Sequence, residues 1–381
     1  MKNTLILGGG IGGIVASNIL KNAAGDSMQV MVIDRELNHH FAAAYPLLMI
    51  GQRKPTDITR QLINLEKKDI HVLHQEVQKI DVTGHQVSTN QGVLSFDYLI
   101  ISLGVEYHTE TVPGFTEYAL NAYDFDGVRK INQQLNNFSS GRIVLFISSL
   151  PYKCPPAPYE IMFLLDQFFR KRGIRNKIEL TLVTPDYSPE PLAKPKVGQS
   201  VRKMLADKGI KLITEAKVLR VEEKGLILDH DTKIAADLLL GIASHWTPEV
   251  LRKSNLVDSS GFVQVDLHTL ETNCPTIFAI GDAAAVKLPV IGAHAPKAGV
   301  FAHYQADVVA RNIYLLSKGA KLEYTYKGKG TCIMNTGFGR ARYSSVQYYK
   351  KPSPSISLWK PTRTAYLAKL GFEKYWFRRF I

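Results

Sequence analysis

The sequence has few cysteines and no long apolar run. Among its 381 residues the cysteines are only Cys154, Cys274 and Cys332. Three cysteines cannot form a disulfide framework, and their spacing is not that of a zinc site. No stretch of about 18 uncharged apolar residues occurs, so no membrane-spanning helix is expected. These absences favour a globular protein of a reducing compartment, with no metal site and with thiols free to act as a redox pair.

Acidic residues are scarce in the last part of the chain. Residues 340–381 hold ten Lys or Arg and one Glu, whereas the preceding residues hold 37 basic and 33 acidic groups, so the tail supplies most of the net charge of +13. Nucleic-acid binding by the whole chain would need basic groups spread over a wider surface. The charge pattern therefore predicts no nucleic-acid partner.

A glycine motif opens the chain. A short buried strand is expected at residues 4–7, followed by Gly8, Gly10 and Gly13 in G-x-G-x-x-G spacing and then by an apolar helix over residues 14–22. A second strand, residues 29–33, ends at Asp34, where a carboxylate can bind a ribose hydroxyl. The combination predicts a dinucleotide site and argues against reading the apolar N-terminus as a signal peptide.

Two later segments extend this site. A strand at residues 276–280 ends in Gly281 and Asp282, which we expect at the start of a helix, and a buried strand within residues 96–107 runs into a turn at Gly104. These segments at these distances resemble the FAD domain of the flavoproteins with two dinucleotide-binding domains, a group that includes glutathione reductase-like proteins, type II NADH dehydrogenases and sulfide:quinone oxidoreductases. The resemblance covers most of the chain up to about residue 310 and implies FAD as cofactor.

A second nucleotide-binding unit is expected between the two parts of that domain. Its strands are predicted at residues 142–147 and 178–183, with a helix over residues 157–172 between them. The turn before this helix, SSLPYKCPPAPYE (residues 148–160), carries four prolines where a phosphate loop needs glycines. Proline has no N–H and a fixed φ, so this turn cannot cradle a pyrophosphate. The unit is expected to have lost its NAD(P)H site.

The proline turn contains a thiol instead. Cys154 is expected at the carboxyl end of a strand and beside a helix N-terminus, whose field favours thiolate. Glu160 follows in the helix and could shuttle protons to sulfur. A second thiol, Cys332, lies beside a glycine-rich segment, so the two cysteines are candidates for a redox pair. Taken singly, Cys154 also suits a buried packing residue and Glu160 a solvated helix acid.

At this point the sequence resembles the sulfide:quinone oxidoreductase family. The resemblance is carried by KCPPAPYE (residues 153–160), by the cysteine that precedes a glycine-rich aromatic segment (residues 332–338) and by APKAG (residues 295–299). It implies that Cys154 and Cys332 are the sulfur-carrying pair, bridged by a disulfide or polysulfide when oxidised. Sulfide opens the bridge, Cys332 attacks the flavin, two electrons enter FAD, and sulfur leaves as polysulfide or elemental sulfur.

The resemblance also implies a membrane quinone as electron acceptor. Lys297, in the APKAG segment, would lie near the flavin and the quinone, and Phe338 would wall the quinone slot. Many family members carry a third cysteine upstream of KCPPAPYE, and residues 110–140 contain none. Covalent attachment of flavin through that cysteine is therefore excluded, and the sulfur-chain length is left open. Cys274 is interpreted as a packing residue.

The tail suggests binding to a bilayer surface. On a helix over residues 356–381, one broad apolar face would hold Tyr366, Leu370, Trp376, Phe377, Phe380 and Ile381. Aromatic rings interleaved with Lys and Arg suit an interfacial anchor. Docking of this helix on the protein's own core is the other interpretation, and the quinone substrate favours the membrane. Anionic lipid and the absence of an export signal favour the cytoplasmic face.

The sequence thus predicts an α/β protein with two Rossmann-like domains and a monotopic C-terminal region. The FAD domain is placed at residues 1–115 and 240–325, the second domain at residues 116–239, and the quinone- and membrane-binding region at residues 326–381. The main alternative is a type II NADH:quinone oxidoreductase, which would need a working phosphate loop in the second domain. A non-catalytic flavoprotein that binds a membrane partner is a further alternative. The oligomeric state is left open, and a homo-oligomer is compatible with the sequence.

Overall fold

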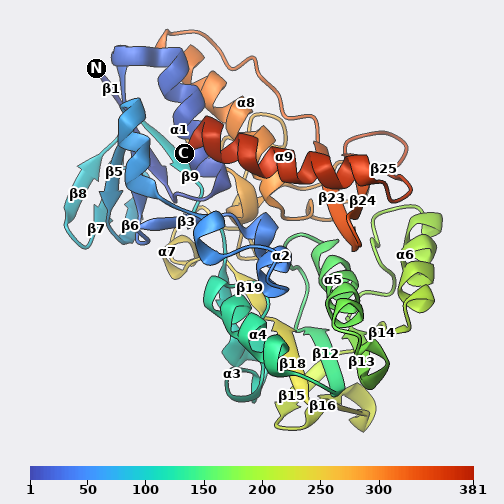
Figure 1. Cartoon of the computed structure of the whole chain (residues 1–381). Coiled ribbons are helices and arrows are strands. Elements are labelled where there is room, and N and C mark those ends of the chain that lie inside the picture. The colour runs from blue at the N-terminus through green and yellow to red at the C-terminus, as the bar shows by residue number, and fades with distance from the viewer.

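The computed structural model describes residues 1–381 and contains two five-stranded parallel β-sheets (Figure 1). The first sheet has the order β21-β9-β1-β2-β5, with every neighbouring pair parallel. Its strands are β1 (Lys2–Leu7), β2 (Met28–Asp34), β5 (His71–His74), β9 (Tyr98–Ile101) and β21 (Ile277–Ala279). Leu5, Ile6 and Leu7 are all fully buried, and because successive strand residues point to opposite faces, both faces of β1 are covered. Helices α1 (Ile11–Ala24) and α8 (Gly299–Ser317) pack against each other beside this sheet.

The second sheet is also parallel and has the order β11-β18-β12-β13-β14. Its strands are β11 (Leu120–Asn121), β12 (Gly141–Ile147), β13 (Ile178–Val183), β14 (Ile210–Ile213) and β18 (Leu238–Ile242). Its helices are α4 (Phe125–Asn137), α5 (Ala157–Lys171) and α6 (Pro195–Asp207). The predicted strand–helix–strand unit is confirmed here to within one residue. Because β18 runs on to Ile242, a domain boundary at residue 239 would cut a strand; the domain boundaries stay a prediction.

The C-terminal region is an antiparallel sheet followed by a helix. Strands β23 (Lys329–Gly337), β24 (Arg340–Gln347) and β25 (Ser355–Leu358) form the sheet, and α9 (Arg363–Phe380) follows it. Strand β23 packs against both α5 and α8, so it lies between helices of the two parallel sheets. Helix α9 runs from β24 back to α1, where Asn18 Nδ2 donates to the Phe380 carbonyl at 2.9 Å (Figure 1).

The apolar face predicted for the tail helix is largely the face that docks on the protein. Trp376, Phe377 and Phe380 are buried, and the Trp376 ring lies 5.3 Å from that of Phe41. Glu373, which interrupts this face in the sequence, is buried in an ion pair with Arg53 at 2.7 Å. The face left exposed carries other apolar side chains: Leu367, Phe372 and Tyr375. The expectation that the Trp376 face meets lipid is therefore wrong, because the protein core already covers it.

The remaining elements are short. The other strands are β3 (Asn38–His40), β4 (Thr59–Gln61), β6 (Val77–Asp81), β7 (Gln86–Thr89), β8 (Gly92–Ser95), β10 (Glu106–His108), β15 (Val218–Glu222), β16 (Gly225–Leu228), β17 (Lys233–Ala235), β19 (Ser244–Trp246), β20 (Val263–Gln264) and β22 (Ala284–Ala285). The other α-helices are α2 (Tyr45–Met49), α3 (Phe115–Tyr118) and α7 (Glu249–Arg252). None of the helices combines the length and the apolar character needed to cross a bilayer.

Candidate active site

A cavity of about 1200 Å³ follows the carboxyl ends of the strands of the first sheet and extends to α5, β23 and α9. It is lined by nine of the predicted site residues: Gly8, Gly10, Asp34, Gly104, Gly281, Asp282, Cys154, Glu160 and Cys332. The fold thus brings together segments that are spread over most of the chain. The strands supply the nucleotide end of the cavity, and the proline turn with β23 supplies the thiol end.

The glycine turn after β1 has the geometry of a phosphate cradle. Gly8 adopts a φ of +101°, which favours glycine, and a Cβ there would run into the Ser102 carbonyl oxygen. A Cβ at Gly13 would run into the Gly8 carbonyl oxygen, so this glycine sets the contact between helix and strand and does not line the cavity. A Cβ at Gly10 would meet no protein atom within 4 Å, so its backbone is open to a ligand.

Two carboxylates mark the ends of this nucleotide region. Asp34 accepts hydrogen bonds from the amides of Gly9 (2.5 Å) and Glu36 (2.8 Å), and burial raises its pKa. Asp282 has one buried carboxylate oxygen with no partner, which suits a hydroxyl donor from a bound ligand. The predicted helix start at Asp282 is a single 3-10 turn (Gly281–Ala283), and the α-helix begins later, at Gly299. The open glycine cradle and the unpaired Asp282 oxygen fit a dinucleotide.

The backbone amides of the proline turn before α5 already donate to carbonyl groups of the protein. The Cys154 amide donates to the Lys297 carbonyl at 2.6 Å, and the Ala157 amide donates to the Cys154 carbonyl at 2.8 Å. Pro155 and Pro156 between them have no amide hydrogen. Cys154 itself adopts a φ of +55°. This turn therefore presents a thiol to the cavity and offers no nest of amides for a pyrophosphate.

Both cavity thiols are free and strongly shifted toward the protonated form. Burial and the neighbouring Glu160 raise the pKa of Cys154 to about 12. Burial and the Cys154 sulfur raise the pKa of Cys332, in the middle of β23, further still. The expectation that the helix N-terminus favours a Cys154 thiolate is therefore wrong, because desolvation and the adjacent carboxylate outweigh the helix field.

Glu160 joins three elements at the thiol end of the cavity. It lies in the first turn of α5, is buried, and accepts a hydrogen bond from Asn335 Nδ2 of β23 at 2.9 Å. Lys369 of α9 donates to the same carboxylate oxygen at 2.5 Å. The carboxylate is thus held beside the thiols by one neutral and one charged donor, and its role in proton transfer stays a prediction.

Comparison with known proteins agrees with this arrangement. The sequence profile of the family described as "Pyridine nucleotide-disulphide oxidoreductase" matches residues 2–145 and 168–306. The chain belongs to this family. Among curated relatives, it is 25% identical to the mitochondrial sulfide:quinone oxidoreductase of Mus musculus, over 91% of this chain and 78% of the mouse protein. It is 26% identical to the NADH dehydrogenase-like protein YutJ of Bacillus subtilis, over 89% of this chain and 92% of YutJ.

The solved structures show the same fold. The sulfide:quinone oxidoreductase of Aquifex aeolicus superposes with a TM-score of 0.89 at 23% identity, covering 98% of this chain and 90% of the other. NDH2 of Plasmodium falciparum gives a TM-score of 0.76 at 15% identity, covering 100% of this chain and 97% of the other. The chain therefore shares its fold with these proteins over almost its whole length.

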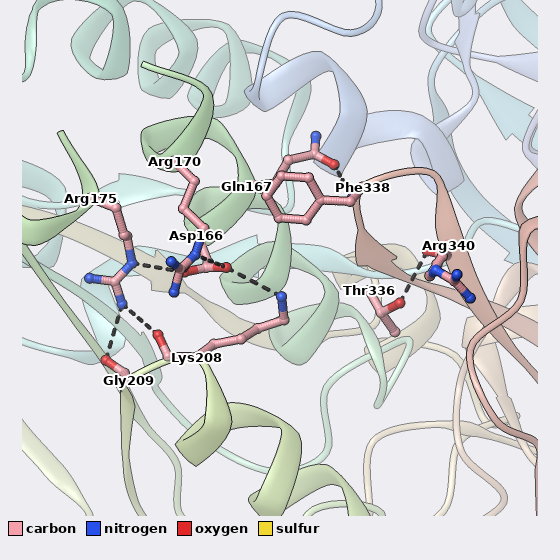
Figure 2. Close-up of polar contacts among 9 residues, drawn as sticks. All are labelled: Asp166, Gln167, Arg170, Arg175, Lys208, Gly209, Thr336, Phe338 and Arg340. Carbon is pink, nitrogen blue, oxygen red and sulfur yellow. Dashed lines mark hydrogen bonds and ion pairs between the residues drawn. The ribbon is translucent and has the colours of Figure 1, made fainter. Parts of the chain in front are cut away.

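Two residues predicted for the quinone site lie outside the cavity of this pyridine nucleotide-disulphide oxidoreductase. The Lys297 ammonium donates to the Ala284 carbonyl at 3.2 Å and lies 3.6 Å from the centroid of the Phe262 ring, and burial lowers its pKa to about 8. Phe338 is 48% exposed at the turn between β23 and β24, where its amide donates to Gln167 (Figure 2). The quinone roles of Lys297 and Phe338 remain predictions, and neither residue contacts the cavity.

Figure 2 also shows what surrounds Phe338. The Lys208 ammonium lies 5.6 Å from the centroid of the Phe338 ring and pairs with Asp166 at 3.3 Å. Asp166 is fully buried and also pairs with Arg170 and Arg175. The C-terminal half of α5 is therefore fixed by a charge network whose members do not line the cavity.

Several cavity residues were missed by sequence reasoning. Lys153 lines the cavity, and its ammonium lies 5.0 Å from the centroid of the Tyr107 ring. Burial acts to lower the pKa of Lys153, but Tyr107 and Asp282 outweigh that effect and hold the pKa above its ordinary value. From α9 come Lys369, Phe372 and Trp376. The available signal was Glu373, a charged residue within the apolar face of the tail. A buried charge needs a partner, so its presence indicated that this face of the helix meets the protein.

Proposed function

We propose that this protein is an FAD-dependent sulfide:quinone oxidoreductase with Cys154 and Cys332 as its redox pair. The observation that carries the proposal is that a glycine cradle and two free thiols line one cavity. The turn of the second sheet has no free amides with which to bind a pyrophosphate. The relatives named sulfide:quinone oxidoreductase support the substrates.

The residues of the cradle would hold the cofactor. The backbone of Gly8 and Gly10 would face the pyrophosphate, Asp34 would accept from a ribose hydroxyl, and Asp282 would accept from a ribitol hydroxyl. FAD, when bound, supplies a two-electron acceptor that can be reoxidised by quinone. Lys153 adds a buried cation to the same cavity, where it would stabilise negative charge on a reduced ligand.

The thiols would carry the sulfur. In the oxidised protein the pair is joined, and HS⁻ attacks one sulfur, so one S–S bond forms while the S–S bond between the cysteines breaks. One cysteine becomes a persulfide and the other leaves as thiolate. Lys369 favours that thiolate, because its charge lowers the pKa of both cysteines. The sulfide sulfur loses two electrons overall, which bound FAD would accept and pass to quinone.

The exposed face of α9 would rest on the bilayer. Leu367, Phe372 and Tyr375 form an apolar stripe, and Arg378 and Arg379 stand exposed at the end of the helix. Rings at the acyl boundary with cations at anionic headgroups suit interfacial binding, here on the cytoplasmic face. Phe372 is exposed in this stripe and also lines the cavity, which supports a route for a bilayer-dissolved quinone at this point.

The test is a coupled assay in anionic vesicles. Sulfide should reduce a short-chain quinone in the presence of the wild-type protein, and Cys154→Ser and Cys332→Ser should each reduce turnover at least about a hundredfold. Cys274→Ser is the matched control and should keep wild-type turnover, because Cys274 lies outside the cavity. Quinone reduction by NADH in place of sulfide would favour the type II NADH dehydrogenase alternative, in line with the similarity to YutJ.

A further inference from the structure

Helix α9 follows the cavity from its thiol end to its glycine cradle. The residues of α9 that line the cavity recur at spacings of three and four and so lie on one side of the helix: Ala368, Lys369, Phe372, Glu373 and Trp376. Lys369 meets Glu160 beside the thiols, and Trp376, two helical turns later, meets His39 next to the cradle. At a rise of about 1.5 Å per residue, these two contacts lie about 10 Å apart along the helix.

His39 links Trp376 to the glycine cradle. It lies in β3, is 5% exposed, and its Nδ1 is 3.1 Å from the carbonyl oxygen of Gly9. The rings of His39 and Trp376 are stacked, with their centroids 5.0 Å apart and their planes inclined by 29°. Both residues line the cavity. The cradle and the last helix of the chain therefore share one part of the cavity wall.

Two ring nitrogens in this wall have no hydrogen-bond partner in the protein. They are Nε1 of Trp376, a residue that is 1% exposed, and Nε2 of His39, and both atoms are buried. A buried polar atom without a partner costs free energy, so native proteins nearly always provide one. The cavity that both residues line is the place from which a bound ligand can provide it.

The two nitrogens differ in the groups that they can bind. The indole N–H of Trp376 can only donate. Because the Gly9 carbonyl can only accept, His39 Nδ1 carries a hydrogen, and burial, which lowers the pKa of His39 to about 4, keeps the ring neutral. His39 Nε2 is therefore an acceptor. A hydroxyl group both donates and accepts, whereas an ionised phosphate oxygen only accepts, so the two nitrogens together suit hydroxyl groups.

We propose that His39 and Trp376 are cofactor-binding residues that hold sugar hydroxyl groups of FAD. The inference rests on FAD, the cofactor of the proposed function, and not on sulfide as the electron donor. FAD carries a ribitol and a ribose on either side of its pyrophosphate, and the cradle that would face this pyrophosphate includes Gly9, to which His39 is bonded. Helix α9 is then part of the cofactor site, and its docking on the cavity and the retention of FAD support each other.

The test is the rate at which the purified holoprotein releases FAD, followed as the rise of free FAD fluorescence after dilution. Trp376→Phe keeps an aromatic ring against His39 and removes only the N–H donor, so release should be about tenfold faster, as expected for one lost hydrogen bond. His39→Asn keeps a donor for the Gly9 carbonyl and removes the Nε2 acceptor, and it should speed release by a similar factor.

Phe377→Leu is the matched control, because Phe377 is buried on the same helix and does not line the cavity. It should lower the melting temperature and release FAD at the wild-type rate. A wild-type release rate in either Trp376→Phe or His39→Asn would overturn the inference. Equally fast release from Phe377→Leu would also overturn it, because helix packing alone would then retain FAD. If sulfide leaves the flavin of the wild-type holoprotein oxidised, the proposed function fails and this inference stands.

Discussion

Lys369 on the C-terminal helix donates to Glu160 beside Cys154 at 2.5 Å, although the two residues are 209 positions apart. Their side chains are 15% and 6% exposed, so this is a buried ion pair. It ties the helix that we propose to rest on the membrane directly to the thiol end of the cavity. A shift of α9 would therefore change the distance of the Lys369 charge from Glu160 and from the thiols.

Removal of the lysine should destabilise the protein. Lys369→Met leaves Glu160 buried with Asn335 as its remaining donor, so we expect the free energy of unfolding to fall by about 3 kcal/mol. Urea denaturation followed by circular dichroism measures this change. Lys374→Met, on the exposed side of the same helix, is the control and should stay within about 0.5 kcal/mol of the wild type. Equal stabilities of the two variants would contradict the role of the pair.

Two glycines of the cradle should respond differently to alanine. Gly10→Ala adds a Cβ that meets no protein atom within 4 Å, so the fold should keep its stability while bound flavin is lost. Gly13→Ala drives a Cβ into the Gly8 carbonyl and should lower stability as well as flavin content. Flavin per protein, from absorbance, and the melting temperature separate the two effects. Full flavin retention in Gly10→Ala would argue against the cradle.

The thiols should react slowly at neutral pH. Burial and Glu160 raise the pKa of Cys154 to about 12, so its thiolate fraction, and with it alkylation by iodoacetamide, should rise about tenfold for each pH unit up to that value. Glu160→Gln removes a negative neighbour, lowers this pKa and should speed alkylation at any fixed pH below it. Mass spectrometry of the Cys154 peptide follows the reaction. A plateau near pH 8 would show that the thiol is not desolvated as described.

The two faces of α9 should give separate phenotypes. The double variant Leu367→Ser/Tyr375→Ser removes exposed apolar groups and should weaken sedimentation with anionic vesicles at unchanged stability. Phe377→Ala opens the buried face and should cost about 3 kcal/mol of unfolding free energy while the exposed stripe remains. If the double variant binds vesicles as well as the wild type does, this stripe is not the membrane-binding surface.

Four of the five strands of the first sheet and the second strand–helix–strand unit could be predicted because their signals are local; β5 was not expected. Short apolar runs, several of them ending in glycine or proline turns, indicate these strands, and the ends of the predicted elements differ by few residues from those expected. Cys154 could be named for the same reason, since KCPPAPYE is a continuous motif, and Cys332 could be named because a continuous glycine-rich segment follows it. The contacts between distant segments of the chain could not be predicted from such local runs.

The missed features depend on contacts between distant parts of the chain. The apolar periodicity of the tail is the same for a helix that meets lipid and for one that meets Phe41, and only the fold shows that Trp376 is covered. The Cys154 pKa depends on burial and on Glu160, and these oppose the field inferred from the helix N-terminus alone.

The central claim is that electrons enter this protein from sulfide through Cys154 and Cys332, and anaerobic absorbance of the bound flavin tests it most directly. The account predicts that sulfide bleaches the flavin band of the wild type, that NADH does not, and that Cys154→Ser and Cys332→Ser remain oxidised after sulfide addition. Bleaching by NADH without bleaching by sulfide would contradict the account and support the NADH dehydrogenase alternative.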